Sequence, residues 1–241
     1  MSLPRSIEGA VNGVLIFSCE HAGNDIPSRY ARYFADSAAK EALQSHRGWD
    51  PGSAELGAHL ARDLAAPLIL QRVSRLLVEC NRSEGHPRLF SEWAASMSER
   101  EREEVVEGYW RPHRAGVRAM VQNAPIGRTV VHVGVHTFTP VWNGRRRSTD
   151  IGLLYDPRRA PEAFVARRWK THLARALAPE GLKVHLNRPY RGWTDALTTT
   201  LRREFPATRY VGLELEVSQG IIPLSHGALR ALSSSLSAAV G

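Results

Sequence analysis

The stretch VLIFSC, residues 14–19, is an almost continuous apolar run of the length of one strand. A strand buried on both faces has this pattern, because a mainly parallel sheet is covered by helices on both sides. Similar runs recur along the chain, at residues 68–70, 76–80, 129–135, 151–155, 183–186 and 210–217. These runs predict a central sheet of six or seven strands.

Helical patterns occupy the segments between the predicted strands. Residues 52–66, 160–177 and 224–239 are predicted helices, because their apolar side chains recur at helical spacing. Strands that alternate with helices predict an α/β three-layer sandwich, with a mixed, mostly parallel central sheet and helices on both faces. Functional residues are then expected beyond the carboxyl ends of the strands.

A further long helix is predicted to begin near Ser98. Ser98 followed by Glu101 is a capping box, in which the serine side chain and the glutamate satisfy backbone N–H groups at the helix start. Pro112 interrupts the apolar pattern of this helix and is expected to cause a kink, because it lacks an N–H and its ring crowds the preceding turn.

Composition and charge limit the classes of function. The chain has 241 residues with 32 Lys+Arg against 24 Asp+Glu, a formal net charge of +8, and all but three of the basic residues are arginines. These arginines are scattered, so nucleic-acid binding rests on net charge alone and no specific nucleic-acid partner is expected. Without repeats or a long linker, residues 1–241 are predicted to form one domain, and nothing in the sequence sets its oligomeric state.

The sequence predicts a cytoplasmic protein without a membrane partner. No apolar run approaches the roughly 18 to 20 residues that span a bilayer, and residues 1–12 lack the pattern of a signal peptide. In a reducing compartment Cys19 and Cys80 are expected to be buried thiols, with a disulfide as the alternative.

Two histidines stand near the ends of predicted strands. His21 follows residues 14–19 on a turn of small residues, where a lone histidine is also a common structural anchor. His132 and His136 lie on one face of the same strand, about 13 Å apart, and so cannot bind one metal ion together. His136, at the carboxyl end, is the candidate site residue, and His132 is predicted to be a core or supporting group.

Two glutamates share one face of the last predicted strand, residues 210–217. Glu214 and Glu216 would be costly to bury in an interior strand unless they had partners, which favours a functional site. Glu216 is the candidate catalytic group because it is nearer the carboxyl end. An edge strand with a solvated face is the alternative.

Asn81 and Arg82 come directly after the predicted strand at residues 76–80. An arginine fork at a strand end suits a carboxylate ligand, although a salt bridge to a neighbouring loop is also possible. Two histidines, a glutamate and this pair, at four strand ends, predict metal-assisted amide hydrolysis. In such a site a metal lowers the pKa of bound water to about 7, a glutamate takes the water proton and an arginine holds a substrate carboxylate.

Six ordered motifs between residues 14 and 219 resemble the N-formylglutamate amidohydrolase family, which is related to the zinc carboxypeptidases. They are CEHAGNDIP (19–27), HRGWDPGSAELG (46–57), SRLLVECNRS (74–83), VHTFTP (135–140), NRPYRGWTD (187–195) and LELEVSQ (213–219). The resemblance implies a zinc-carboxypeptidase-like α/β fold. It also implies hydrolysis of a small anionic N-acyl amino acid, typified by N-formyl-L-glutamate giving L-glutamate and formate.

The resemblance also implies one zinc ion, with His21 as its first ligand and His136 as its last. The carboxypeptidase relatives carry a glutamate three residues after the first histidine, where this chain has Asn24. Asp50, in the GWDPG turn, is therefore the candidate third ligand, with Asn24 and Glu20 as alternatives. Helix capping is the structural alternative for Asp50.

By the same resemblance Glu216 is the general base, and Asn81 with Arg82 match the pair that binds a substrate carboxylate. Tyr190 resembles a mobile-loop residue that donates a hydrogen bond to the substrate or transition state, and Arg188 would add a contact for the distal carboxylate. Two alternatives stay open. One is a non-catalytic small-acid-binding protein of the same fold, motivated by Asn24, and the other is a hydrolase for another acyl amino acid or a short peptide.

Overall fold

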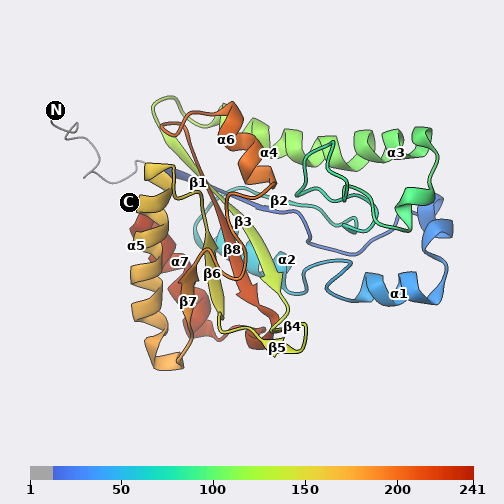
Figure 1. The fold of residues 1–241 in the computed structure, drawn as a ribbon. Helices are drawn as coiled ribbons and strands as arrows, with labels where there is room; N and C mark the ends of the chain where they lie inside the picture. The colour runs from blue at the N-terminus through green and yellow to red at the C-terminus, as the bar shows by residue number, and fades with distance from the viewer. Residues whose placement is uncertain (1–12) are drawn as a thin grey trace.

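A computed structural model describes residues 13–241, and residues 1–12, where the signal-peptide pattern is lacking, lie outside the described part. Its centre is a six-stranded sheet in the order β2-β1-β3-β8-β6-β7 (Figure 1). The strands are β1 (Gly13–Cys19), β2 (Leu68–Leu70), β3 (Thr129–Phe138), β6 (Ile151–Leu154), β7 (Val184–Leu186) and β8 (Tyr210–Ser218). Six of the predicted strands are thereby confirmed.

The sheet is mixed and mostly parallel, as predicted. Strands β2, β1, β3 and β8 run in one direction, whereas β6 is antiparallel to β8 and parallel to β7. Strand β8 lies between β3 and β6, so Glu214 and Glu216 belong to an interior strand and the edge-strand alternative is wrong. The carboxyl ends of β1, β3 and β8 meet at one edge of the sheet, where the site is expected.

One face of the sheet is covered by α2 (Ser53–Asp63), α5 (Ala160–Leu177) and α7 (His226–Val240). Leu60, Trp169 and Leu232 of these helices pack with strand side chains such as Val133 and Leu213 in the largest apolar cluster. Burial of this apolar surface is the main contribution to the stability of the sandwich.

The opposite face is covered by α4 (Arg111–Asn123) and α6 (Leu197–Glu204). Val117 and Leu201 of these helices pack on Ile16 of β1 and Val130 of β3. Helices therefore lie on both faces, which confirms the predicted sandwich. Nearer the carboxyl edge this second face carries polar side chains instead of apolar ones, and these build the site.

The predicted strand at residues 76–80 is wrong, because the chain there forms turns. Leu77, Val78 and Cys80 are nevertheless fully buried, in a separate apolar cluster that includes Tyr30 and Met97. The apolar run correctly indicates that this segment is buried, but a buried strand and a buried turn have the same apolar pattern.

The helix predicted from the capping box is confirmed at its start. The side chain of Ser98 accepts a hydrogen bond from the N–H of Glu101 and begins α3 (Glu99–Val105). A π-helical turn, Val106–Trp110, then separates α3 from α4, and Pro112 stands in the first turn of α4. The helix is thus interrupted by a π-helical turn directly before α4, and Pro112 lies in the first turn of α4, where its missing N–H costs least.

Several short elements lie outside the predictions. They are α1 (Ser37–Gln44), α6, the 3₁₀ helices Ser28–Phe34, Ala94–Ser96, Ala178–Glu180 and Gln219–Ile221, and the hairpin of β4 (Val141–Trp142) and β5 (Arg145–Arg146). The Asn143-Gly144 pair is a sequence signal for this hairpin. Both residues take positive φ, the backbone conformation that a tight Asn-Gly turn requires.

Cys19 and Cys80 are free and buried, which confirms the predicted thiols. Burial raises the pKa of Cys19 to about 12. Among residues 13–241 no helix combines the length and the apolar character that crossing a membrane requires.

Candidate active site

A cavity of about 410 Å³ opens at the edge where β1, β3 and β8 end. Seven of the eight candidate residues from the sequence line it, namely His21, Asp50, Asn81, Arg82, His136, Tyr190 and Glu216. The eighth, Arg188, is exposed and is not among the lining residues, whereas Arg191 of the same loop is. The fold therefore brings together residues from six separate segments of the chain.

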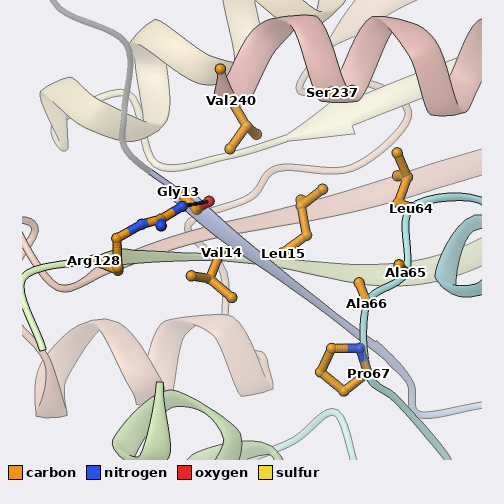
Figure 2. Close-up of a pocket in the computed structure, with 11 residues that line it drawn as sticks. Gly13, Val14, Leu15, Leu64, Ala65, Ala66, Pro67, Arg128, Ser237 and Val240 are labelled. Carbon is orange, nitrogen blue, oxygen red and sulfur yellow. Dashed lines mark hydrogen bonds between the residues drawn. The ribbon is translucent and has the colours of Figure 1, made fainter. Parts of the chain in front are cut away.

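A larger cavity of about 650 Å³ lies at the other end of β1. Figure 2 shows that its walls are mostly apolar, with Val14, Leu15, Pro67 and Val240. Arg128 crosses it to donate a hydrogen bond to the Gly13 carbonyl, at 3.0 Å. None of the candidate residues lines this cavity, so the chemistry points to the smaller one.

His21, Asp50 and His136 form a group that could hold a metal ion. The Nδ1 atom of His21 lies 3.2 Å from Asp50 Oδ2 and 3.2 Å from His136 Nδ1, and His136 Nδ1 lies 3.1 Å from Asp50 Oδ2. Three ligand atoms of a tetrahedral zinc site with bonds of 2.0 to 2.1 Å are about 3.4 Å apart. The triangle in this protein is close to that size, so the three residues fit such an ion.

Carboxylates stand behind both histidines. Glu79 Oε1 lies 2.5 Å from His21 Nε2, and Glu20 Oε2 lies 3.1 Å from His136 Nε2. The other oxygen of Glu20 lies 3.2 Å from His113 Nε2 on α4. Such carboxylates fix the tautomer and orientation of histidines that bind metals. Glu20 thus contacts the far side of His136, in a supporting position.

The charges of this group are strongly perturbed. Burial opposes a charged imidazole, but the hydrogen bond to Asp50 and the negative charge of nearby Glu20 outweigh it and hold the pKa of His136 well above its usual value. Burial raises the pKa of Asp50 despite the hydrogen bond from His136. A positive charge is therefore favoured between these acids, whether it is a proton or a metal ion.

Glu216 lies on the neighbouring strand, paired in register with His136. Burial raises the pKa of its carboxyl group to about 8, and Asp50 adds to this effect. Its Oε2 atom is buried and has no hydrogen-bond partner among the described residues. An unpartnered carboxyl group beside a cavity, titrating near neutral pH, suits proton transfer.

Arg75 is a site residue that the sequence reasoning missed. Its guanidinium donates to His21 Nδ1 and lies 3.4 Å from both Asp50 Oδ1 and Glu79 Oε2. The positive charge of Arg75 thus lies next to the candidate metal ligands, which indicates that these ligands favour a cation. The available signal was Arg75 and Glu79 flanking the buried run of residues 76–78.

Asn81 and Arg82 follow the turn at residues 76–80. Asn81 Oδ1 accepts a hydrogen bond of 2.8 Å from the N–H of Leu197, which leaves its amide as the donor group. Arg82 donates through Nη1 to the carbonyl of Asp195. The carbonyl of Arg82 accepts from Trp110 Nε1 at 3.0 Å, so the π-helical turn supports this pair.

The loop that carries Tyr190 lies directly on β6. Asn187, at a φ of 51°, accepts hydrogen bonds through Oδ1 from the N–H groups of Tyr155 and Gly192, at 3.0 and 3.1 Å. A Cβ on Gly152 would lie 1.9 Å from the Arg188 carbonyl oxygen, and one on Gly192 would lie 2.1 Å from Tyr155 N. Only glycine allows this approach.

Two further polar residues lie apart from the metal group. His132 is fully buried between Ser18 Oγ and the Tyr210 hydroxyl, each 2.7 Å away, as expected of a core histidine. Burial lowers the pKa of His132 to about 4. Asn24 donates its amide to the Leu43 carbonyl, at 2.9 Å. Asp50, not Asn24, thus lies beside His21 and His136, so Asn24 gives no reason to expect a non-catalytic protein.

The comparison with protein families agrees with this geometry. The model described as N-formylglutamate amidohydrolase matches residues 13–222. The chain belongs to the N-formylglutamate amidohydrolase family. Membership of this family supports an enzyme of the amidohydrolase type, acting on a small acyl amino acid.

Solved structures with the same fold include two that span nearly the whole chain. A gene product from Agrobacterium tumefaciens is 28% identical with a TM-score of 0.74, covering 96% of this chain and 94% of its own. An N-formylglutamate amidohydrolase from Ralstonia eutropha is 17% identical with a TM-score of 0.59, covering 97% and 93%. No curated protein matched the chain. The similarity to the Ralstonia enzyme shows that the two proteins have the same fold.

Proposed function

We propose that the protein is a zinc-dependent amidohydrolase that cleaves N-formyl-L-glutamate to L-glutamate and formate. The observation that carries this proposal is the convergence of three ligand atoms, 3.1 to 3.2 Å apart, beside the unpartnered carboxyl group of Glu216. Metal-ligating groups and a proton-transfer group in one cavity are the minimum that metal-assisted hydrolysis requires.

His21, Asp50 and His136 would hold the zinc ion. When bound, it would supply Lewis-acid polarisation of the carbonyl and a lowered pKa for a water molecule. The Arg75 guanidinium would leave His21 Nδ1, because that atom has one lone pair for either the ion or an N–H donor. Arg75 would stay in the cavity, where its charge can stabilise the negative charge that develops on the carbonyl oxygen.

Glu216 would act as the general base. Its carboxylate would take a proton from the water that attacks the formyl carbon, and then deliver that proton to the amine nitrogen as the C–N bond breaks. Formate and glutamate are the products, so the atoms balance. Burial raises the pKa of Glu216 to about 8, and a nearby cation would favour the carboxylate that a general base needs.

Arg82 and Asn81 would bind the α-carboxylate of the substrate, because both offer N–H donors at the cavity wall. The distal carboxylate would lie against Arg191 or Arg88, which also line the cavity. These two arginines replace Arg188 in this role, since Arg188 does not line the cavity. Tyr190 would donate its hydroxyl proton to the substrate carbonyl oxygen.

The direct experiment measures metal content and formate release together. Purified protein should contain zinc, and formate release from N-formyl-L-glutamate should disappear with a chelator and return with added zinc. Glu216→Gln should keep the zinc and lose activity by at least about 100-fold. Full activity in Glu216→Gln would exclude the proposed base. Activity that survives complete removal of metal would exclude the zinc mechanism.

The same assay would distinguish substrates. N-formyl-L-methionine tests whether the distal carboxylate is required, and N-acetyl-L-glutamate tests whether the acyl group is. A clear preference for N-formyl-L-glutamate supports the proposal, whereas equal rates for all three would point to a broader acyl amino acid hydrolase.

A further inference from the structure

The β4–β5 hairpin stands beside the mouth of the cavity, and Arg147 follows it directly. The Arg147 guanidinium lies over three aromatic rings, 5.2 Å from the centre of Phe138, 5.3 Å from Trp142 and 5.1 Å from Tyr190. Its backbone N–H donates to the Pro140 carbonyl, at 2.8 Å. One side chain thus connects the end of β3, the hairpin and the Tyr190 loop.

Arg147 also contacts the hydroxyl of Tyr190. Its Nη1 lies 3.0 Å from that oxygen. A guanidinium can only donate hydrogen bonds, whereas a phenol has one proton to donate and two lone pairs to accept. Arg147 therefore occupies a lone pair of Tyr190 and leaves the phenolic proton free for another acceptor. Since Tyr190 lines the cavity, that acceptor can be a substrate oxygen.

We propose that Arg147 is a positioning residue that holds Tyr190 at the cavity mouth and keeps its hydroxyl proton available to the substrate carbonyl oxygen. The proposal rests on the proposed function, in which Tyr190 is that donor. The positive charge of Arg147 also withdraws electron density from the phenol, which strengthens Tyr190 as a donor when negative charge develops on the carbonyl oxygen.

Other hairpin arginines do not share this arrangement. Arg146 is exposed, and among the described residues its side chain makes no hydrogen bond, ion pair or cation–π contact. Arg147 is half-buried among the three rings. A lysine at position 147 could donate to the Tyr190 oxygen, but its compact ammonium group could not lie flat over three rings. Arg147→Lys therefore keeps the charge and the hydrogen bond but loses the stacking. A substitution of Arg146 removes a charge without removing either contact.

A double-mutant cycle tests the inference. Arg147→Met and Tyr190→Phe should each lower kcat for N-formyl-L-glutamate by about 10- to 100-fold, with little change in KM. The double variant should be no slower than Tyr190→Phe, because Arg147 acts through the hydroxyl. Arg147→Lys should restore part of kcat, and Arg146→Met should match the wild type. An equal loss from Arg147→Met in both backgrounds would overturn the proposal, because general loosening of the hairpin has that effect.

Hydrogen exchange gives a readout that does not depend on activity. Arg147→Met should speed amide exchange in residues 138–147 and 187–193 of the zinc-loaded protein, and Arg146→Met should not. Unchanged exchange in Arg147→Met would overturn the proposed connection of hairpin and loop. A wild-type protein without amidase activity would instead refute the proposed function, while faster exchange in Arg147→Met would still support the connection.

Discussion

The Nδ1 atoms of His21 and His136 face each other at 3.2 Å, although 115 residues separate them in the chain. Two imidazole lone pairs at this distance repel unless a proton or a metal ion lies between them. Asp50 Oδ2 is 3.1 to 3.2 Å from both nitrogens, so a cation bound by His21, Asp50 and His136 together would satisfy all three atoms.

Substitution of one ligand should remove the metal. We expect about one zinc ion per chain in the wild type and a small fraction of that in His136→Gln or Asp50→Asn, because two remaining ligands bind zinc weakly. Elemental analysis of dialysed protein measures this directly. The control is His172→Gln, an exposed histidine on α5, which should retain the metal. Full zinc content in Asp50→Asn would mean that Asp50 is not a ligand.

Removing the carboxylate behind His21 should weaken the metal without abolishing it. Glu79→Gln loses the negative charge next to His21 Nε2, and we expect zinc affinity to fall by about 10- to 100-fold. Competition with a zinc chelator gives the dissociation constant. Glu84→Gln, which removes an exposed acid paired with Arg111, should leave the affinity unchanged. Equal affinity in Glu79→Gln and wild type would assign Glu79 to packing alone.

Much of the fold was predictable because burial leaves a regular pattern in a parallel sheet. The runs at residues 14–19 and 210–217 are strands, and His21 and Glu216 lie near their carboxyl ends as expected. The run at residues 76–80 has the same apolar character, yet its backbone does not pair with a strand. Its side chains pack against side chains of helical segments instead. Apolar periodicity does not distinguish these two kinds of burial.

The missed parts of the candidate site depend on contacts between distant segments. Glu79 lies in the segment that was predicted to be a strand, and Arg75 directly precedes it, so their role was hidden by the error in the fold. Arg147 is one of three consecutive arginines, and nothing local distinguishes it from Arg146. Only the positions of three aromatic rings from separate segments make it different.

Two arginines of the same loop should differ in their effect on the substrate. Arg191 lines the cavity and Arg188 does not, so Arg191→Gln should raise KM for N-formyl-L-glutamate by about tenfold and Arg188→Gln should leave it unchanged. Kinetics with N-formyl-L-methionine provide the matched comparison, because that substrate lacks the distal carboxylate. If Arg188→Gln raised KM and Arg191→Gln did not, Arg188 would be the residue that contacts the distal carboxylate, as predicted from the sequence.

Acidification should destabilise the protein through His132. Its pKa is lowered by burial from 6.5 to about 4, so between these pH values the unfolded chain binds a proton that the folded chain does not. Stability is therefore fully present above pH 6.5 and falls as the pH drops toward 4, by about 3 kcal/mol from this group.

Urea unfolding of His132→Gln and wild type from pH 7 to pH 4.5, with chelator present, measures this difference. The variant is expected to be less stable at pH 7, because it loses the contacts to Ser18 and Tyr210. Its deficit should shrink as the pH falls, whereas His172→Gln should follow the wild type. A deficit that stays constant with pH would contradict the lowered pKa of His132.

The loop bearing Tyr190 rests on β6 at backbone contact distance, at Gly152 and Gly192. The distance between the loop and β6 is thus set by direct backbone-to-backbone contact. We therefore expect these two positions to mark the shape of the cavity in other members of the family. A homologue with a larger residue at either position must carry the loop farther out, and its substrate profile should be compared separately from that of this protein.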